Sequence, residues 1–232
     1  MGRDVIIACD FDSKEQTLDF LDKLGDHKPY VKIGMELYYA EGPSIVKALK
    51  ERGYKIFLDL KLHDIPNTVK KAMKVLSNLD VDMCNLHAAG TCKMMEAALE
   101  GLTREDGSRP LLIAVTQLTS TTQERMEADM LIDEPMEKVV SHYASNAKNS
   151  GLDGVVCSPL ESAKVHEVCG EGFLTVTPGV RFADDDKGDQ ARVTTPAKAK
   201  ELGSDYIVVG RSITAAADPK AAYERCIGEF VG

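Results

Sequence analysis

The sequence predicts a closed (β/α)8 barrel that forms a single domain over residues 1–232. Eight short apolar runs recur along the chain, and segments with helical spacing of apolar residues separate them. Strands that alternate with helices form parallel sheets, and a count of eight favours closure into a barrel. An open doubly wound sheet usually has a glycine-rich turn after its first strand. Here the first strand leads into ACDFDS, which contains no glycine, so we expect the barrel.

The apolar runs and the helical segments alternate from one end of the chain to the other. No linker, shift in composition or block of like charge interrupts the alternation, which supports a single domain. We expect strands at 5–11, 30–34, 55–61, 83–87, 111–116, 154–158, 174–180 and 206–210. We expect helices, from apolar residues at every third or fourth position, at 14–25, 37–52, 65–78, 91–101, 134–150, 159–169, 195–203 and 215–230.

The composition restricts the class of partner and the compartment. A net charge of -9 argues against nucleic acid or an anionic membrane as the main partner. The N-terminal residues do not look like a secretion signal, and no apolar run is long enough to span a membrane. Six cysteines lie scattered without C-x-x-C spacing. We therefore expect a reduced, cytoplasmic protein with no disulfide framework and no metal site.

The third expected strand carries two charges where a buried strand should have none, in the stretch KIFLDLKLHDIPNT. Asp59 and Lys61 are two positions apart, so on a strand both side chains point to the same face. Asp64 follows, just before the next expected helix. Burial of such groups costs several kcal/mol each unless they are paired, so we expect a paired cluster. Two alternatives are a structural ion pair between Asp59 and Lys61, and a helix N-cap at Asp64, which Pro66 closely follows.

Polar residues also stand at the ends of other expected strands. Asp10 ends the first strand, Lys32 lies in the second, and the fifth leads into 116–120 (TQLTS). Barrel enzymes carry their active sites at the C-terminal ends of the strands. We therefore expect these groups to converge with Asp59 and Lys61 at one mouth of the barrel. Such convergence favours an active site over a structural ion pair.

The turns after the seventh and eighth strands are expected to bind phosphate. Barrels often hold a phosphate there through backbone N–H groups and a nearby helix N-terminus. Gly179 and Gly210 allow the backbone to approach a ligand closely, and Arg181 and Arg211 can form forked hydrogen bonds to phosphate oxygens. Either arginine alone would more often be a solvated surface residue, so the interpretation depends on the pair.

The segment 181–195 (RFADDDKGDQARVTT) is long and polar and contains a glycine. Loops of this length in a compact domain tend to be lids or disordered segments. Gln190 is its neutral hydrogen-bond donor, and a lid that closes on phosphate needs a donor. We expect a phosphate-gripping lid; the alternative is a solvated loop in which Gln190 has no role.

Taken together, these motifs resemble the orotidine 5′-phosphate decarboxylase family. The resemblance lies in D-x-K-x-x-D-I-P-N-T at 59–68, preceded by Asp10 and Lys32 and followed by P-G-V-R at 178–181 and G-R at 210–211. It extends from the first strand to the last. It implies a homodimeric (β/α)8 barrel that converts orotidine 5′-monophosphate to UMP, the last step of pyrimidine nucleotide synthesis, without a metal or an organic cofactor.

The resemblance also implies roles for individual residues near the reacting carbon. Lys61 would protonate the ring carbon that loses CO2, and Asp59 would lie against the departing carboxylate. Lys32 would hold the charge network and contact the ribose, and Asp10 would bind a ribose hydroxyl. Asp64 would reach into the site of the neighbouring subunit.

Further substrate contacts follow from the same resemblance. Ile65 and Thr68 would accompany Asp64 into the neighbouring site, so that two chains complete each mouth. Thr119 would meet the pyrimidine. The remaining residues would form the phosphate side of the site: Gln190 and Arg211 would grip phosphate, Arg181 is a second candidate there, and Pro178 and Gly210 belong to the same substrate-binding turns.

Two other functions remain open on sequence grounds. One is a Mg²⁺-dependent sugar-phosphate decarboxylase or aldolase of the same superfamily, which shares the D-x-K-x-x-D motif but has an acidic residue where Lys32 stands. An ammonium at that position repels a divalent cation, so Lys32 discriminates against this function. The other is a catalytically silent barrel that only binds nucleotides. The presence of all five charged residues argues against it: Asp10, Lys32, Asp59, Lys61 and Asp64.

Overall fold

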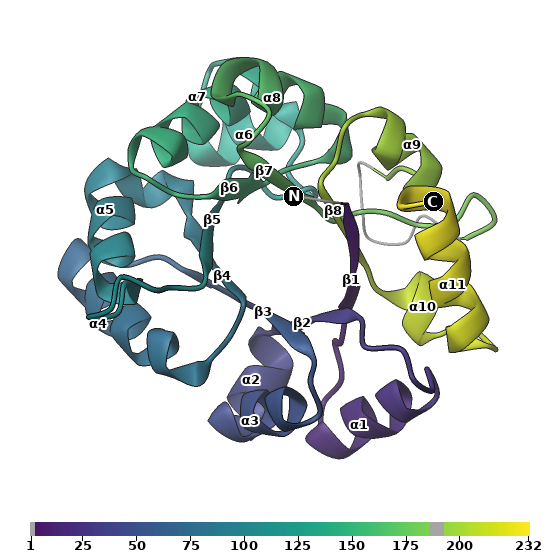
Figure 1. Ribbon diagram of the computed structural model, residues 1–232. Helices are drawn as coiled ribbons and strands as arrows, with labels where there is room; N and C mark the ends of the chain where they lie inside the picture. The colour runs from purple at the N-terminus through teal and green to yellow at the C-terminus, as the bar shows by residue number, and fades with distance from the viewer. Residues whose placement is uncertain (1–2, 186–192) are drawn as a thin grey trace.

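The computed structural model of the protein describes residues 3–185 and 193–232 and contains eight parallel strands in a closed barrel. The strands follow one another around the barrel in chain order, and the first pairs with the last (Figure 1). Helices surround the barrel on its outside. The expected (β/α)8 barrel is thus confirmed. The strands are β1 (Asp4–Ala8), β2 (Tyr30–Gly34), β3 (Lys55–Leu62), β4 (Met83–His87), β5 (Leu111–Val115), β6 (Gly154–Val156), β7 (Leu174–Thr177) and β8 (Tyr206–Val209).

Several helices begin where the sequence offers a cap or a proline. Ser13, Thr122, Thr195 and Asp218 accept a hydrogen bond from a backbone N–H in the first turn of the helix that follows each of them. No helix in the described ranges has the length and hydropathy needed to cross a membrane. The α-helices are α1 (Lys14–Asp22), α2 (Met35–Glu41), α3 (Pro43–Glu51), α4 (Pro66–Leu76), α5 (Thr91–Leu102), α6 (Gln123–Met130), α7 (Met136–Asn149), α8 (Ser162–Cys169), α9 (Pro196–Glu201), α10 (Arg211–Thr214) and α11 (Pro219–Phe230), with 3₁₀ turns η1 (Ser77–Leu79), η2 (Ala88–Gly90) and η3 (Pro159–Glu161).

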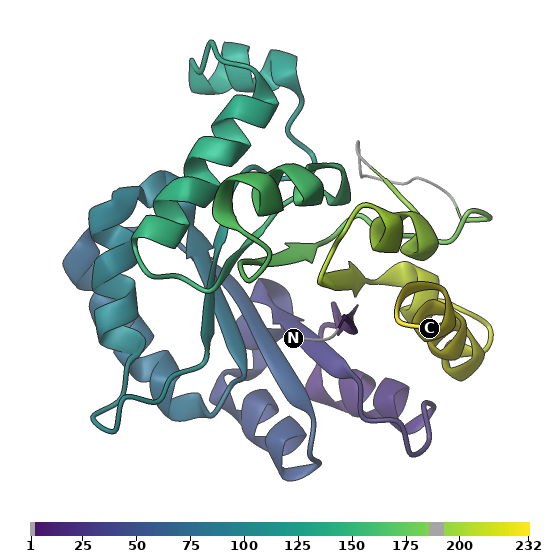
Figure 2. The ribbon, with the colours of Figure 1, turned by 45° about the horizontal axis from the view of Figure 1, so that its top comes forward.

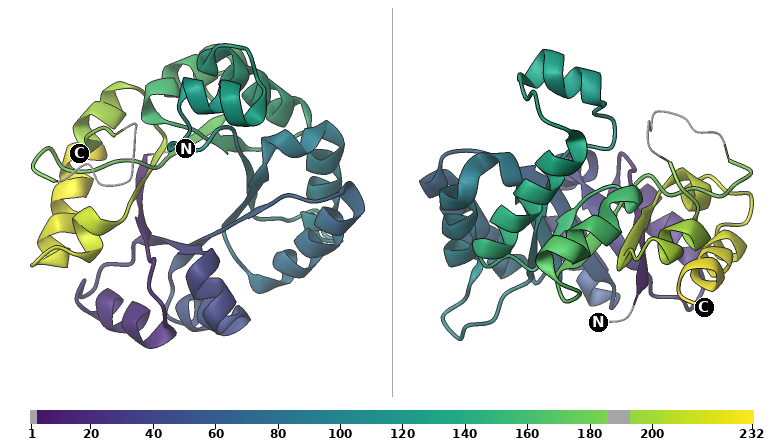
Figure 3. Two further views of the ribbon diagram at one scale, coloured as in Figure 1. Left: turned by 180° about the vertical axis from the view of Figure 1, so that it is seen from behind. Right: turned by 90° about the horizontal axis from the view of Figure 1, so that it is seen from above.

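The single helix expected over 37–52 is wrong, because the structure divides this segment into α2 and α3. Gly42 ends α2 with φ of 60°, a conformation that favours glycine, and Pro43 starts α3 at a position where its missing N–H is not needed. Helix α6 was not expected either. Its residues are mostly polar, and Figures 2 and 3 show it standing away from the barrel, where it has little apolar surface to bury.

Several strands are shorter than the apolar runs that predicted them. Strand β1 ends at Ala8 rather than at 11, and β5 ends at Val115. Asp10 and the segment 116–120 consequently lie on loops just past the C-terminal ends of their strands. In a barrel these loops form the mouth, so the shortening moves these residues toward the site and not away from it.

The inside of the barrel is an apolar plug below a polar upper layer. Ten buried side chains fill it, among them Tyr30, Phe57 and Met83 from β2, β3 and β4. The next inward positions on these strands, two residues further along, are Lys32, Asp59 and Asn85, all nearly buried. A second, larger apolar cluster packs the outer face of the barrel against the helices. Because the plug excludes water from below, the charged layer can reach solvent only through the mouth.

The contact between α4 and α5 depends on a glycine, which gives a prediction. A Cβ at Gly101 would collide with the backbone carbonyl oxygen of Lys70, whereas a Cβ at Gly228 in α11 would meet nothing within 4 Å. Gly101→Ala should destabilise the protein by about 1–3 kcal/mol through overpacking. Gly228→Ala, the matched control, should stabilise it by up to about 1 kcal/mol because alanine is the better helix former. Urea denaturation of both variants measures this; equal effects would contradict the packing argument.

Candidate active site

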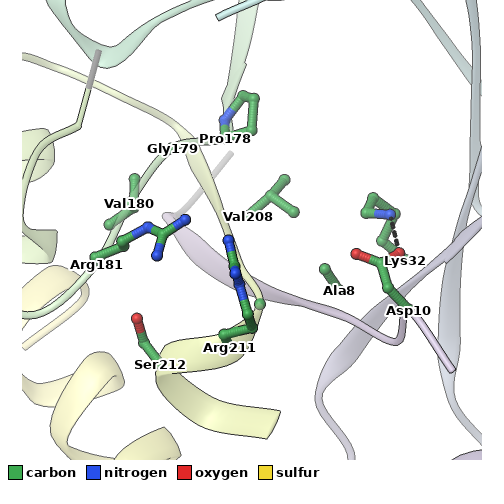
Figure 4. A pocket seen from close by; sticks show the side chains of 11 residues that line it. Ala8, Asp10, Lys32, Pro178, Gly179, Val180, Arg181, Val208, Arg211 and Ser212 are labelled. Carbon is green, nitrogen blue, oxygen red and sulfur yellow. Dashed lines mark hydrogen bonds and ion pairs between the residues drawn. The ribbon is translucent and has the colours of Figure 1, made fainter. Parts of the chain in front are cut away.

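Two adjoining cavities open at the C-terminal mouth of the barrel and share Lys32, Pro178 and Val208 in their walls. The first, of about 490 Å³, lies over the turns after β7 and β8. Figure 4 shows the guanidinium groups of Arg181 and Arg211 close together on one side of it. The second, of about 220 Å³, extends across the mouth toward β3 and β5, and its lining residues include Asp59, Lys61, Gln117, Thr119 and Ser120.

Four charged side chains form a chain of alternating sign at this mouth. Lys32 Nζ lies 2.9 Å from Asp10 Oδ1 and 3.5 Å from Asp59 Oδ2. Lys61 Nζ lies 2.6 Å from Asp59 Oδ1. Asp59 is therefore bracketed by two ammonium groups, and its side chain is only 10% exposed. The two carboxylates and two ammoniums balance in charge, which is the condition under which burial of ions is tolerated.

The charges around Asp59 and Lys32 determine the protonation states of these two residues. Burial alone would raise the pKa of Asp59, but the charges of Lys32 and Lys61 and the hydrogen bonds from Lys61 and Asn85 hold that pKa below its usual range. Burial alone would lower the pKa of Lys32, but Asp59 and Asp10 outweigh it and keep that pKa above its usual range. Both groups are therefore charged at neutral pH.

Lys61 has an unusual backbone. Its φ is 51°, in the left-handed region that a lysine rarely adopts, at a cost of about 1–3 kcal/mol unless the surroundings fix it. The pairing of β3 with β4 is irregular at the same place, with Leu58 opposite Cys84 and Leu62 opposite Leu86. Strand β3 thus advances four residues while β4 advances two, so Asp59 and Lys61 lie in a bulge. The regular strand assumed from the sequence is wrong here, although the two side chains do meet.

Asn85 belongs to the site and was missed by the sequence analysis. It lies on β4, is 1% exposed, and donates from Nδ2 to Asp59 Oδ1 over 2.7 Å. Its Oδ1 accepts a hydrogen bond from the backbone N–H of Lys61 over 2.8 Å. The only signal in the sequence was an amide within the apolar run MCNLH, which has the same inward phase as Met83.

His87 closes the same edge of the mouth at the end of β4. Its ring centre lies 5.7 Å from that of His63. Burial first, and then His63 and Lys61, lower the pKa of His87, against a smaller opposing effect of Asp59. A neutral imidazole therefore stands beside the lysine at neutral pH and adds no further positive charge.

Asp64, Ile65 and Thr68 lie on the rim and do not line either cavity. All three are exposed, and Ile65 is 66% exposed. Asp64 Oδ1 accepts a hydrogen bond from the backbone N–H of Ile65, and the residue at the N-cap of α4 is Ile65 itself, without a side-chain cap. The N-cap interpretation of Asp64 is therefore wrong.

The expected phosphate turns lie side by side. Gly179 has φ of 77°, which brings the chain from Pro178 toward Arg181 around the first cavity. Gly210, Arg211 and Ser212 line the same cavity from the other turn. Sequence reasoning thus identified the two turns that line this cavity.

The expected lid begins and ends at one place. The backbone N–H of Arg181 donates to Thr194 O over 3.0 Å, and that of Thr194 donates to Gly179 O over 3.1 Å. The two ends of 181–195 are thus joined at the edge of the first cavity. Gln190, its expected phosphate donor, lies outside the described residues. Within residues 3–185 and 193–232, no group of three or more His, Cys, Asp or Glu side chains is arranged to hold a metal ion.

Barrel, alternating charges and paired arginines together define a class: a (β/α)8 enzyme for a small phosphorylated substrate. Comparison with known proteins identifies the family within that class. Residues 3–226 match the Orotidine 5′-phosphate decarboxylase / HUMPS family, and the chain belongs to it.

Relatives and solved structures agree over the full length. The chain is 57% identical to the orotidine 5′-phosphate decarboxylase of Bacillus cytotoxicus, covering 100% of this chain and 99% of that one. It is 56% identical to the enzyme of the same name from Geobacillus sp. strain WCH70, over 100% and 98% of the two chains. The crystal structure of orotidine 5′-phosphate decarboxylase from Lactobacillus acidophilus superposes with a TM-score of 0.88 at 48% identity, over 99% of this chain and 100% of that one.

The bracketed Asp59 gives a prediction for the pH dependence of stability. Because its folded-state pKa is depressed, its stabilisation is present above the unfolded-state value of about 3.9 and is lost as pH falls through the folded-state pKa. The stability difference between wild type and Asp59→Asn should therefore shrink as pH falls from about 6 to about 3. Urea denaturation across this range measures the difference, and a constant difference would show that Asp59 is not held ionised.

Proposed function

We propose that the protein decarboxylates orotidine 5′-monophosphate to UMP without a metal or an organic cofactor. The observation that carries the proposal is the chain Asp10–Lys32–Asp59–Lys61 at the barrel mouth, where the cavity lined by Asp59 and Lys61 adjoins the cavity lined by two arginines. Shared Lys32, Pro178 and Val208 show that the two cavities adjoin, as one nucleotide requires. Full-length identity to enzymes named for this reaction supports the assignment.

Lys61 supplies the positive charge and the proton. When the bond between the ring carbon and the carboxylate breaks, the electron pair stays on an sp² carbon with little delocalisation. The transition state is therefore stabilised by a nearby, preorganised positive charge. Lys61 is partly exposed to the second cavity and fixed at a strand end. Its ammonium transfers a proton to the ring carbon, CO2 leaves, and solvent returns a proton to the amine.

Asp59 acts on the bound reactant. A substrate carboxylate placed beside it would face a like charge, and the repulsion disappears as neutral CO2 forms. At about 4 Å and an effective dielectric of about 20, one such contact amounts to about 4 kcal/mol. The most powerful enzymes lower barriers by roughly 20 kcal/mol or more, so stabilisation of the carbanion and remote binding must provide the larger part.

The phosphate end provides the remote binding. The guanidinium groups of Arg181 and Arg211 lie close together on one side of the first cavity, and Ser212 lies beside them (Figure 4). Contacts there can raise the chemical rate as well as affinity when their energy is used to organise the site. We include in this proposal the segment 181–195 as a cover over the phosphate; the hydrogen bonds that join Thr194 to Gly179 and Arg181 at the edge of the first cavity support that position.

Lys32 favours this function over the Mg²⁺-dependent alternative. Its ammonium lies between the carboxylates of Asp10 and Asp59, the place where a divalent cation would otherwise bridge two acids. Lys32 stays charged although it is buried, because both acids raise its pKa. The silent-barrel alternative is disfavoured because nucleotide binding alone does not require the strained, closely paired lysine at 61.

We further propose a homodimer in which Asp64, Ile65 and Thr68 complete the site of the neighbouring subunit. Support comes from their exposure on the rim of the mouth, and from an isoleucine that is 66% exposed there. A carboxylate from a second chain would add a third acid near Lys61. A cytoplasmic location fits the six free cysteines, five of which are buried.

The first functional prediction concerns Lys61. The wild type should convert orotidine 5′-monophosphate to UMP with unchanged rate in a metal chelator. Lys61→Ala should lose more than about 10⁴-fold in turnover, because both the proton donor and the charge are removed. Its affinity for UMP should persist. Lys55→Ala, at the exposed start of the same strand, is the matched control and should keep full activity. Absorbance assays and calorimetry measure these; near-normal turnover of Lys61→Ala would remove the assignment.

The second functional prediction concerns the proposal that two chains complete each active site. Lys61→Ala and Asp64→Ala should each be inactive. A mixture that exchanges subunits should regain about a quarter of the wild-type activity, since half of the dimers are hybrids and one of their two sites is intact. If each chain built its own site alone, the mixture would show only the sum of the separate activities.

A further inference from the structure

We propose that Asn85 is a positioning residue for the decarboxylation: it fixes the left-handed backbone of Lys61 and the orientation of Asp59 at the same time. The inference rests on the proposed function and adds a residue to its machinery. Asn85 is buried at 1% exposure on β4, opposite the bulge of β3 that carries both charged residues. One side chain thus connects the proton donor to its acidic neighbour.

The two hydrogen bonds require an acceptor atom and a donor atom on the same side chain. A backbone N–H only donates, so the atom facing Lys61 N at 2.8 Å must be an acceptor, Oδ1. A carboxylate with a depressed pKa only accepts, so the atom facing Asp59 Oδ1 at 2.7 Å must be a donor, Nδ2. Among side chains of this size only asparagine presents both on one fork. Ionised aspartate lacks the donor, and leucine, of similar volume, lacks both the donor and the acceptor.

The hydrogen bond from the Lys61 backbone N–H to Asn85 matters because of the backbone conformation of Lys61. Its φ of 51° is a conformation that persists only when the surroundings impose it. The bulge removes regular ladder bonds between Leu58 and Leu62, so the N–H of Lys61 needs a partner from elsewhere, and Asn85 provides it. Without that bond the backbone could relax toward the extended region, and the side chain would swing away from the cavity.

The hydrogen bond from Asn85 to Asp59 fixes which neighbours each carboxylate oxygen of Asp59 faces. Asp59 Oδ1 receives both Asn85 Nδ2 and Lys61 Nζ, whereas Oδ2 faces Lys32 at 3.5 Å. The amide fixes the plane of the carboxylate, so that one edge serves the proton donor and the other serves the ribose side. A rotated carboxylate would move both the charge opposite the substrate and the resting position of Lys61.

The first arm of the test compares Asn85→Leu with the wild type. Turnover on orotidine 5′-monophosphate should fall about 100-fold, the size of effect expected when a reacting group is displaced by about 1 Å. Affinity for UMP should change by less than about threefold, because the phosphate and ribose contacts remain. Thermal unfolding is measured in parallel. A folded Asn85→Leu with turnover within about threefold of the wild type would overturn the inference.

The second arm uses Asn85→Asp and pH. The groups that face this position are Asp59 and Lys61 on β3, Lys32 on β2 and His87 on β4, with His63 beside His87, whereas β5 faces it with the uncharged Ile113 and Val115. In its protonated form the new carboxyl can accept from Lys61 N and donate to Asp59, as asparagine does.

The activity of Asn85→Asp relative to the wild type should therefore rise as pH falls, by about tenfold per pH unit while pH exceeds the pKa of that carboxyl. The relative activity of Asn85→Leu should stay flat over the same range. A purely structural role would give flat ratios for both variants, and flat ratios would overturn the inference.

The third arm does not depend on activity. In ¹⁵N-lysine-labelled wild type, the Lys61 amide should show strong protection from hydrogen exchange, as a bond to a buried side chain requires. Exchange at the rate of an exposed amide would overturn the inference even if the variants fail to fold. If the wild type itself formed no UMP, the proposed function would fail, while this measurement would still decide whether Asn85 holds the Lys61 backbone.

Discussion

The buried carboxylate of Asp59 is the constraint on which the site depends. A charge at 10% side-chain exposure is stable only if neighbours compensate it, and here two ammoniums and one amide do so. Each of those neighbours comes from a different place: Lys61 from the same strand, Lys32 from β2 and Asn85 from β4. The parallel register of three adjacent strands is therefore what makes the carboxylate tolerable.

This balance also explains how the site can act on a charged substrate. Two carboxylates and two ammoniums neutralise one another before any ligand arrives. A ligand that brings its own carboxylate adds an uncompensated negative charge beside Asp59, and loss of CO2 restores the balance. In the proposed reaction, the same arrangement that stabilises the folded protein disfavours the reactant and favours the product side of the bond cleavage. Binding at the arginine end must then supply the energy that holds the reactant in place.

The barrel places the charged groups around Asp59 and the two arginines on different sides of its mouth. Apolar side chains fill its interior from Ile6 to Val208, so the charged layer rests on a dry, closely packed support. The turns after β7 and β8 carry the arginines on the opposite side of the mouth, with Lys32 and Pro178 in the wall between.

The sequence by itself determined the barrel, its eight strands and the residues at its mouth. Hydrophobic periodicity is a local property, and the placement of Asp10, Lys32, Asp59, Lys61 and the two glycine–arginine turns at strand ends follows from it once the count reaches eight. It did not determine the break at Gly42, the helix α6 or the bulge in β3, because these depend on backbone angles and packing partners that have no period in the sequence.

Tertiary structure alone decided the two hydrogen bonds of Asn85. An amide in a strand contributes nothing until the register of a neighbouring strand brings a carboxylate and an unpaired backbone N–H to its two ends. The two hydrogen bonds join residues that are 24 and 26 positions apart in the chain. They depend on the register of β4 relative to β3, which no local sequence pattern determines.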